Sequence, residues 1–439
     1  MSLQSTGTTS RQRISQWHRE SGFASAEPAE PAPPPPGAAR ATPTLPSDEA
    51  LHALSERFAA RAAAHDRDGS FAFENIAELH QLGLLALTVP RALGGAGAGL
   101  ADARRIVHHV AAGDPSTALV LVMQILGHRN LAQDTQWPAA VRAQVQRSAV
   151  EQGALINSLR VEPELGSPAR GGLPATVARR HGEGWLLSGH KIYSTGIPAL
   201  SWLAVWGRTD EPVPRTGVFL VPRDAPGITV VPTWDHLGMR ATGSHDVVFD
   251  NTPLPAAYAV DLRLPAAWGE RYDPAWAVWT STLLGTLYDA VARSARDWFV
   301  AWLNLRAPGS LGAPLATLPR FQEAVGRIDG WLLANRVLLE RFSADADAGA
   351  PASASDSNLL KFNVTDNAIA AVELALRHAG NPALSRGNPL ERHYRNVLCS
   401  RIHTPQNDAI LAGAGAQALR AAADIATHAA AATPSGSQA

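Results

Sequence analysis

The sequence predicts an α+β protein in which a compact β-domain lies between two helical regions. Apolar residues recur with helical spacing early in the chain, short runs rich in Val, Trp, Tyr and Thr follow, and long helical repeats complete it. This order favours segregated helical and β domains over an alternating α/β sheet. We expect a leader over 1–46, an N-terminal helical domain over 47–152, a β-domain over 153–262, a helical bundle over 263–432 and a tail over 433–439.

Capping residues and apolar spacing predict the N-terminal helices. Ser47 precedes a stretch in which Leu51, Leu54 and Phe58 share one face, as in an amphipathic helix with a serine N-cap. A second helix should stop at Gly83, and a Gly-rich loop then leads to two further apolar helices. The last of these is apolar on nearly every side, so it should lie in the centre of its domain. The expected helices cover 47–65, 74–83, 101–113 and 115–132.

The central and C-terminal elements follow from two further patterns. Gly, Pro and Asp turns separate short β-type runs at 175–180, 184–194, 202–209, 216–222, 227–232 and 245–250. Helical periodicity then resumes and predicts a four-helix bundle at 276–303, 321–346, 355–380 and 407–426. No G-x-G-x-x-G unit between a strand and a helix and no P-loop is present, so a Rossmann fold is not expected. Residues 26–46 are rich in Pro and Ala and predict an extended leader.

Composition and charge exclude several classes of function. A formal net charge of -1 gives no broad basic surface for nucleic acid or for an anionic membrane. Cys399 is the single cysteine, which excludes an intrachain disulfide and a cysteine-based zinc site and favours a reducing compartment. The sequence has no apolar run long enough for an anchor and no secretory signal, and its histidines lack metal-ligand spacing. We expect a cytoplasmic protein with no metal, nucleic-acid or membrane partner.

Four sequence strings narrow the choice of protein family. They are LHQLGLLALTVPRALGGAGAGL, VEPELGSP with GWLLSGHKIYSTGIPALSWLAVWGRT, WDHLGMRATGSHDVVFDNTPLP, and NPLERHYRNVLCSRIH. In this order they resemble characteristic strings of the acyl-CoA dehydrogenase family, from about Ser47 to Ala426. The resemblance implies the fold of that family, with an N-terminal helical domain, a central β-barrel-like domain and a C-terminal four-helix bundle. It also implies a flavin-dependent oxidoreductase that assembles as a homotetramer.

The resemblance further implies a flavin site on the β-domain. In the family, residues of a K-x-x-T-G stretch pack on the isoalloxazine ring and bond near N5, and Ser194 and Thr195 are the principal matches. The arginine that reaches the cofactor pyrophosphate matches Arg306, but the usual phenylalanine is missing and the glycine turn near the adenine keeps only Gly380. FMN therefore fits at least as well as FAD. The implied cofactor-binding residues are Tyr193, Ser194, Thr195, Gly196, Glu162, Ser167 and Arg306.

The catalytic carboxylate of acyl-CoA dehydrogenases has no counterpart in this sequence. Its usual position matches Thr404, and a position used by a minority of members falls near Ala275, with Asp273 and Glu270 displaced from it. The string RNVLCSRIHTPQ resembles more closely a segment of the dibenzothiophene-monooxygenase-like (class D) flavin monooxygenases, whose active-site histidine matches His403. An imidazole can exchange protons near neutral pH. The catalytic residues implied by this resemblance are His403, Thr195 and His128.

Three functions remain open from the sequence. The first is a two-component monooxygenase that takes reduced FMN from a separate flavin reductase and uses O2 on a small organic substrate, apolar or bearing sulfur or nitrogen. The second is an FAD-dependent acyl-CoA dehydrogenase whose base is another carboxylate, such as Asp408 or Glu391. The third is a non-catalytic binding or assembly subunit that keeps the fold, because one fold hosts several functions.

Overall fold

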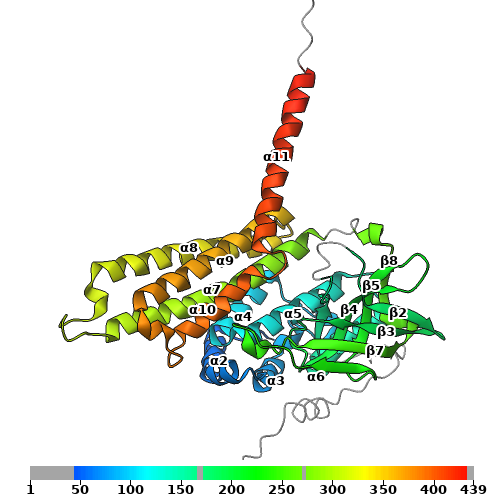
Figure 1. The fold of residues 1–439 in the computed structure, drawn as a ribbon, viewed down its shortest axis with the longest axis horizontal. Coiled ribbons are helices and arrows are strands. Elements are labelled where there is room, and N and C mark those ends of the chain that lie inside the picture. Colours follow the sequence, from blue (N-terminus) through cyan, green and yellow to red (C-terminus); the bar gives the residue numbers. More distant parts are fainter. Residues whose placement is uncertain (1–43, 166–171, 269–272, 433–439) are drawn as a thin grey trace, which may run out of the picture.

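The computed structural model describes residues 44–165, 172–268 and 273–432. Within them the chain is helical, then mainly β, then helical again, which confirms the predicted α+β fold class (Figure 1). The leader expected over 1–46, apart from its last three residues, and the tail over 433–439 lie outside the described residues. None of the described helices is long and apolar enough to span a membrane.

The N-terminal region consists of α2 (Asp48–Asp68), α3 (Phe73–Gln81), α4 (Leu100–Gly113), α5 (Pro115–Gln133) and α6 (Ala139–Gln152). The Ser47 side chain caps α2 by accepting a hydrogen bond from the Ala50 backbone N–H, as its position in the sequence predicts. Helix α5 is apolar all round and is buried on nearly every side, against α4, the bundle helix α7 and the first strand. It therefore joins the three parts of the fold. Helix α6 was not predicted, because apolar side chains are sparse along it.

The central sheet consists of β1 (Leu155–Leu159), β2 (Val177–His181), β3 (Gly184–Lys191), β4 (Leu200–Thr209), β5 (Thr216–Pro222), β6 (Ile228–Val231), β7 (Asp246–Leu254) and β8 (Ala259–Arg263). Its strand order is β6-β7-β3-β2-β4-β5-β8, and β1 pairs with β4 in parallel. The six predicted runs form β2 to β7. The sequence did not indicate β1, because it is buried on both faces except at Ser158 and so lacks polar alternation.

The C-terminal bundle packs α7 (Pro274–Leu305), α8 (Pro319–Asp347), α9 (Ala354–Ala379) and α10 (Leu390–Leu398) together. Helix α11 (Asn407–Ala432) forms where a fourth bundle helix was expected, but it projects away from the body and contacts α9 near its start (Figure 1). The shorter α10 lies against α7 and α9 instead. Helix α11 is rich in alanine, and its large side chains Leu411 and Leu419 are exposed, so it has little apolar surface with which to join the bundle.

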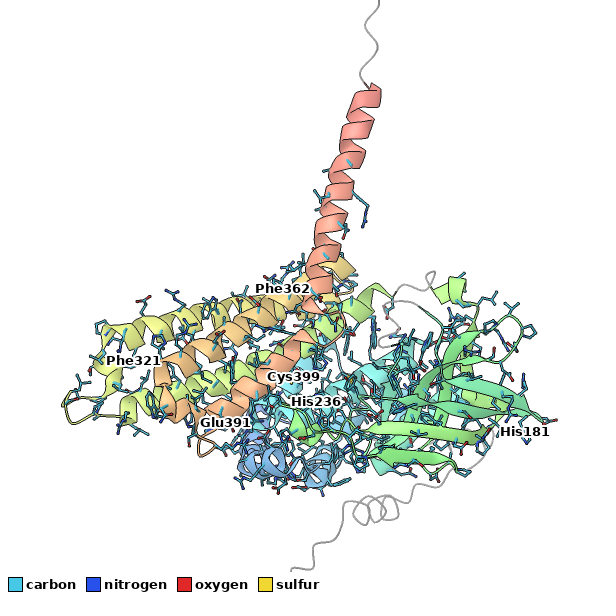
Figure 2. The ribbon with its side chains drawn as sticks, in the orientation of Figure 1. His181, His236, Phe321, Phe362, Glu391 and Cys399 are labelled. Carbon is cyan, nitrogen blue, oxygen red and sulfur yellow. The ribbon has the colours of Figure 1, made fainter. Side chains whose placement is uncertain are left out.

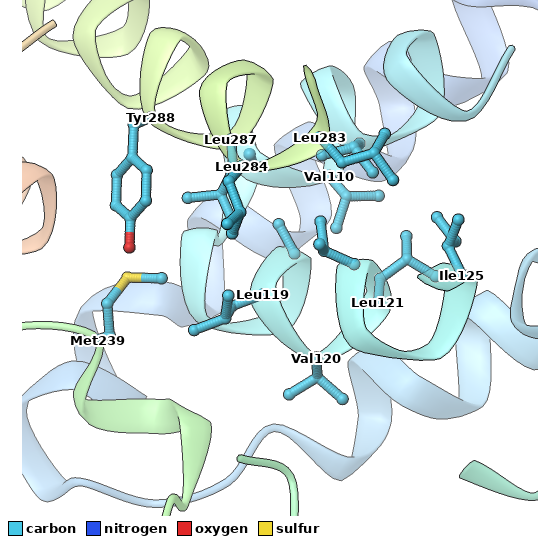
Figure 3. Close-up of a cluster of buried hydrophobic side chains, with 14 of the residues drawn as sticks. Val110, Leu119, Val120, Leu121, Ile125, Met239, Leu283, Leu284, Leu287 and Tyr288 are labelled. Carbon is cyan, nitrogen blue, oxygen red and sulfur yellow. The ribbon is translucent and has the colours of Figure 1, made fainter. Parts of the chain in front are cut away.

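The β-domain and the bundle meet along α5 and at the loop that follows β6. Leucines of α5 and α7 pack against one another in the shared core (Figure 3). On the loop, the Met239 backbone N–H donates to Asn396 Oδ1 of α10 at 2.7 Å. In Figure 2, His236 on the loop and Cys399 after α10 mark this contact. The loop that follows β6 therefore contacts α10 at the junction of the β-domain and the bundle.

Candidate active site

The ends of β1 and β3 lie side by side on the β-domain. The Ile192 backbone N–H donates to the Val161 carbonyl at 3.0 Å, and Asn157 Nδ2 donates to the Thr195 carbonyl at 2.9 Å. These bonds join the exit of β1, where the Arg160 side chain is exposed, to the turn that follows β3. Two strings that are about 30 residues apart in the sequence thus form one surface.

The turn over 193–196 presents an aromatic ring and two hydroxyl groups. Tyr193 has a left-handed backbone (φ 56°) and a 53% exposed side chain, whose ring meets the edges of Trp234 and His236 at centroid distances of 6.3 and 5.8 Å. Positive φ is uncommon outside glycine, and such strain concentrates at functional sites. Ser194 is buried, and its Oγ finds no hydrogen-bond partner among the described residues. Gly196 also has a positive φ, 80°, which glycine adopts without strain.

A chain of hydrogen bonds leads from Thr195 toward the helical bundle. Thr195 Oγ1 lies 3.0 Å from Ser244 Oγ, which lies 2.8 Å from Thr242 Oγ1. The Thr242 hydroxyl in turn donates to the Met239 carbonyl at 2.9 Å. Met239 also has a left-handed backbone (φ 54°), and its side chain belongs to the same buried cluster as Tyr288 of α7 (Figure 3). The hydrogen-bonded chain from Thr195 therefore ends at the cluster that contains Tyr288.

Tyr288 brings His403 into this site. The Tyr288 hydroxyl lies 2.6 Å from His403 Nε2, and the two rings are tilted with centroids 5.7 Å apart. Burial, with a smaller contribution from the nearby Lys361 charge, lowers the pKa of His403 to about 4. Burial likewise raises the pKa of the Tyr288 phenol above its ordinary range. At neutral pH both groups are uncharged, so the Tyr288 O–H can donate to the free Nε2 lone pair of His403.

Tyr288 was not predicted as a site residue from the sequence. It stands in the apolar stretch TLLGTLYDAV, where an aromatic residue at helical spacing is ordinarily part of a core. One signal in the sequence could have indicated Tyr288. A tyrosine in an otherwise apolar, buried helix implies a polar group nearby, because a buried tyrosine hydroxyl needs a hydrogen-bond partner. That partner comes from a residue 115 positions later in the chain.

His128 lies on α5 at the other side of the domain junction. It is 1% exposed, and neither ring nitrogen has a hydrogen-bond partner among the described residues. Burial lowers the pKa of His128 to about 3, so the ring is neutral. The preceding Gly127 lies against Ile156 of β1, which places His128 next to the sheet. No contact in the described part of the chain links His128 to His403, so its predicted catalytic role stays a prediction.

A buried polar ring without partners weakens the fold, which makes His128→Leu an informative change. We expect this variant to raise the free energy of unfolding by about 1–3 kcal/mol, the cost of a buried unpaired polar group, and to lower turnover about tenfold or more. Urea unfolding and turnover should be measured on the same preparation. His393→Leu is the matched control, because His393 is also buried with an unpartnered ring nitrogen but lies on α10. Unchanged turnover in His128→Leu would remove His128 from the catalytic set.

Glu162 is bonded to groups inside the β-domain. Its carboxylate is 1% exposed and bonds Lys191 Nζ at 2.6 Å, the Thr176 hydroxyl at 2.6 Å and the backbone N–H groups of Ala175 and Thr176 at 2.7 and 2.9 Å. Burial alone would raise the pKa of Glu162, but these donors outweigh it and hold the pKa below its ordinary value. The side chain is fully engaged inside the β-domain, where it joins the segment after β1 to the end of β3, and its predicted contact with a cofactor stays a prediction.

Two predicted cofactor residues are not placed at this site. Ser167 lies outside the described residues. Arg306 follows the end of α7, is exposed, and lies 18 residues beyond Tyr288, which is roughly 27 Å along a helix. Within one chain, Arg306 is therefore remote from the Tyr288–His403 pair.

Of the carboxylates considered as alternative bases, Glu270 lies outside the described residues, and the other three are bonded to other groups. Asp273 caps α7 by accepting from the Ala275 backbone N–H at 3.0 Å, and it also pairs with Arg129. Glu391 forms two hydrogen bonds with the Arg395 guanidinium, at 2.7 and 3.0 Å. Asp408 is exposed on the first turn of α11 and accepts a hydrogen bond from the Ala409 backbone N–H at 2.9 Å. None of the three contacts the Tyr288–His403 pair.

The fold and this arrangement of segments define a family. Residues 47–135, 160–252 and 290–408 match the N-terminal, middle and C-terminal domains of acyl-CoA dehydrogenases, respectively. These matches cover more than half of the chain. The protein belongs to the acyl-CoA dehydrogenase family.

Three similar proteins carry different descriptions. The Bacillus subtilis protein described as "Putative acyl-CoA dehydrogenase YdbM" is 32% identical over 84% of this chain and 96% of its own length. L-evernosamine nitrososynthase of a Micromonospora species is 32% identical over 81% of this chain and 85% of its own. The structure of KijD3 in complex with FMN and a dTDP-linked 3-amino sugar superposes with a TM-score of 0.73 at 30% identity, covering 84% of this chain and 92% of KijD3.

Proposed function

We propose that this protein is a flavin-dependent monooxygenase that inserts oxygen into a small organic substrate, with an amine nitrogen as the first class of target. One observation carries the proposal: the position of the family's catalytic carboxylate matches Thr404, and beside it lies the neutral His403–Tyr288 pair, whose contacts among the described residues include no carboxylate. Removal of an α-proton from a thioester needs a carboxylate held in place. The nitrososynthase relative and KijD3, which binds FMN with an amino sugar, support the amine class.

The chain's own residues fit a flavin at the 193–196 turn. The exposed ring of Tyr193 offers a flat apolar face, and the hydroxyls of Ser194 and Thr195 offer hydrogen bonds to ring heteroatoms. The unpartnered buried Oγ of Ser194 is the polar atom that such a partner would satisfy. Bound there in reduced form, FMN or FAD supplies electrons for the activation of O2.

Proton transfer in this proposal falls to His403, assisted by Tyr288. Because His403 is neutral and its Nε2 faces the Tyr288 hydroxyl, a substrate proton would reach it through Tyr288, which passes its own proton to Nε2 as its oxygen takes one from the substrate. The Tyr288 hydroxyl, 2.6 Å away, orients the ring and can stabilise the proton once it is transferred. Thr195 begins the hydroxyl chain on the opposite side of the site and fixes the turn that would carry the flavin. His128 adds a second neutral imidazole at the sheet end of α5.

The proposal includes partners beyond the substrate. A separate flavin reductase would supply reduced FMN, and a homotetramer would bring Arg306 of another copy toward the cofactor phosphate that one chain alone cannot reach. The projecting α11, with Leu411 and Leu419 exposed, is available for contact between copies. A cytoplasmic location accords with the single cysteine and with the supply of reduced flavin.

Two absorbance measurements test the proposal on FMN-loaded and FAD-loaded protein. In the first, reduced protein is mixed rapidly with oxygenated buffer, and we expect a long-lived species with a spectrum distinct from reduced and oxidised flavin. In the second, butyryl-CoA is added anaerobically to oxidised protein, and we expect no bleaching. Immediate return to oxidised flavin together with bleaching by butyryl-CoA would establish the dehydrogenase instead. Failure to retain either flavin at saturating concentration would favour the non-catalytic subunit.

Product analysis then tests the substrate class. A dTDP-linked amino sugar is incubated with NADH, FMN, a flavin reductase and 18O2, and one labelled oxygen atom is expected on the product nitrogen. The same mixture without the protein controls for oxidation by free reduced flavin. A labelled product formed equally in both mixtures would contradict the proposed substrate class.

A further inference from the structure

Lysine is almost absent from this protein, and both lysines are buried. Of the 38 basic residues in the sequence, Lys191 and Lys361 are lysines and the other 36 are arginines. Each of the two lysines is 0% exposed. Arginine and lysine differ in geometry, since the ammonium group directs three donors around one atom and the guanidinium is a planar fork. In a chain that uses arginine nearly everywhere, a buried lysine indicates a position that requires the ammonium geometry.

Lys361, on α9, faces the segment that carries His403. Its Nζ donates to the His403 carbonyl at 2.8 Å, to the Pro405 carbonyl at 2.7 Å and to Asn407 Oδ1 at 3.2 Å. One turn later on α9, Thr365 Oγ1 accepts a hydrogen bond from Asn407 Nδ2 at 3.3 Å. Three oxygens of a single segment thus converge on one ammonium group, which uses all three of its donors.

The hydrogen bonds of the Lys361 ammonium group all go to the 403–407 segment. No carboxylate of the described residues lies within ion-pair distance of Nζ, so the ammonium is balanced by the carbonyl and amide oxygens. A cation buried in this way is costly, and the absence of a paired carboxylate means that it does not stabilise the fold as an ion pair. The titratable groups nearby are His403 in the segment, Tyr288 on α7 and Cys399 after α10. The buried charge of Lys361 therefore lies next to the proposed catalytic histidine, His403.

We propose that Lys361 is the positioning residue of the active site, which holds the 403–407 segment on α9 so that the His403 imidazole meets the Tyr288 hydroxyl. The 403–407 segment is held on α9 by the bonds of Lys361 and by the bond between Asn407 and Thr365, and it meets α7 through the His403 imidazole and Tyr288. Without the bonds to Lys361, the His403 imidazole loses its fixed geometry relative to the Tyr288 hydroxyl. The inference rests on the proposed function insofar as it assigns His403 to proton transfer. The positioning itself is a property of the chain.

Lys361→Met and Lys361→Gln test the inference by NMR on full-length protein labelled at the histidine ring carbons. In Lys361→Met, which removes the charge and every donor, we expect the pKa of His403 to rise above about 4, because the nearby cation is lost and the loosened segment is less well buried. Hydrogen exchange of the amides over 402–407 should accelerate about tenfold or more. Lys361→Gln keeps two donors without charge, so it should restore much of the exchange protection. Turnover of the flavin-loaded Lys361→Met protein should fall about tenfold or more while KM changes less.

Two controls keep the inference falsifiable. Val364→Ala removes a buried side chain from the same helix without touching the segment, and it should leave the His403 titration and the exchange at 402–407 unchanged. Wild-type protein labelled with [13C]lysine should show two ε-carbon signals from the folded chain, and the Lys361 signal should titrate near pH 8. The His403 ring signals, whose own pKa is about 4, should shift a second time as Lys361 loses its proton. This measurement needs no variant, so a variant that fails to fold does not remove the test.

The outcomes separate this inference from the proposed function. A His403 titration and exchange rates that are the same in Lys361→Met and wild type would overturn the positioning role, whatever the activity. If the NMR readouts change in Lys361→Met but His403→Phe is still fully active, the positioning role of Lys361 stands and the catalytic role of His403 is refuted. If the chemical shifts of the His403 ring signals do not change as Lys361 titrates in wild-type protein, the inference is also overturned.

Discussion

A phenylalanine in place of His403 is expected to lower turnover of the flavin-loaded protein by about 10²- to 10⁴-fold, the usual contribution of a general acid or base. The change keeps an aromatic ring of similar size on the 403–407 segment and removes the nitrogen that meets Tyr288 at 2.6 Å. Substrate affinity should change much less, because the lost interaction acts on a proton in the transition state. Initial rates with the reductase-coupled assay measure both quantities.

Tyr288→Phe and the double variant complete this experiment. The phenol hydroxyl acts through His403 in the proposed site, so its removal should cost about 10- to 100-fold. The double variant should then be little worse than His403→Phe alone, because residues that act as a unit are not additive. His181→Phe on the exposed end of β2 is the control for an unrelated histidine. Full activity of His403→Phe would contradict the assignment, and additive losses would show that the two residues act independently.

The second large effect is expected at the Glu162–Lys191 pair. Lys191→Met leaves a carboxylate that is 1% exposed without its cationic partner, and breaking such a pair costs about 3–5 kcal/mol. Because Glu162 and Lys191 join the exits of β1 and β3, flavin affinity should fall together with stability. Urea unfolding monitored by circular dichroism gives the free energy of unfolding. A loss below about 1 kcal/mol would mean that the pair is not the buried ion pair described here.

The pH dependence of this variant gives an independent check. With Lys191 removed, burial raises the pKa of Glu162 above its unfolded value, so the folded state binds a proton more readily than the unfolded state. Stability of Lys191→Met should therefore increase as pH falls from 8 toward 5, and its deficit relative to wild type should shrink. In wild type the pKa of Glu162 is lowered, so its contribution is lost only as pH falls through that lower pKa. Glu162→Leu in the Lys191→Met background should recover most of the stability, because an apolar pair replaces the ions.

The sequence alone determined the fold class and the order of the domains. Short-range signals did this: Ser47 ahead of a helical apolar face, Gly83 at a helix end, and alternating β-type runs between turns, each of which acts within a few residues. The same local character explains what was missed. Helix α6 and strand β1 have weak hydrophobic periodicity, so they were missed. The expected fourth bundle helix forms as α11 but does not pack in the bundle, because hydrophobic periodicity predicts a helix and not the elements that the helix contacts.

The motifs also predicted His403 and Thr195 as site residues and Thr404 at the position of the family's carboxylate, since those predictions depend on the resemblance of short strings. Only the tertiary structure decided what these residues contact. Tyr288 meets His403 across 115 positions, and Lys361 reaches the same segment from 42 positions away. Glu162 proved to be bound within the β-domain, and Arg306 lies far from the site in its own chain. Hydrogen bonds and burial between distant segments set these roles, and a one-dimensional pattern does not record which distant groups become neighbours.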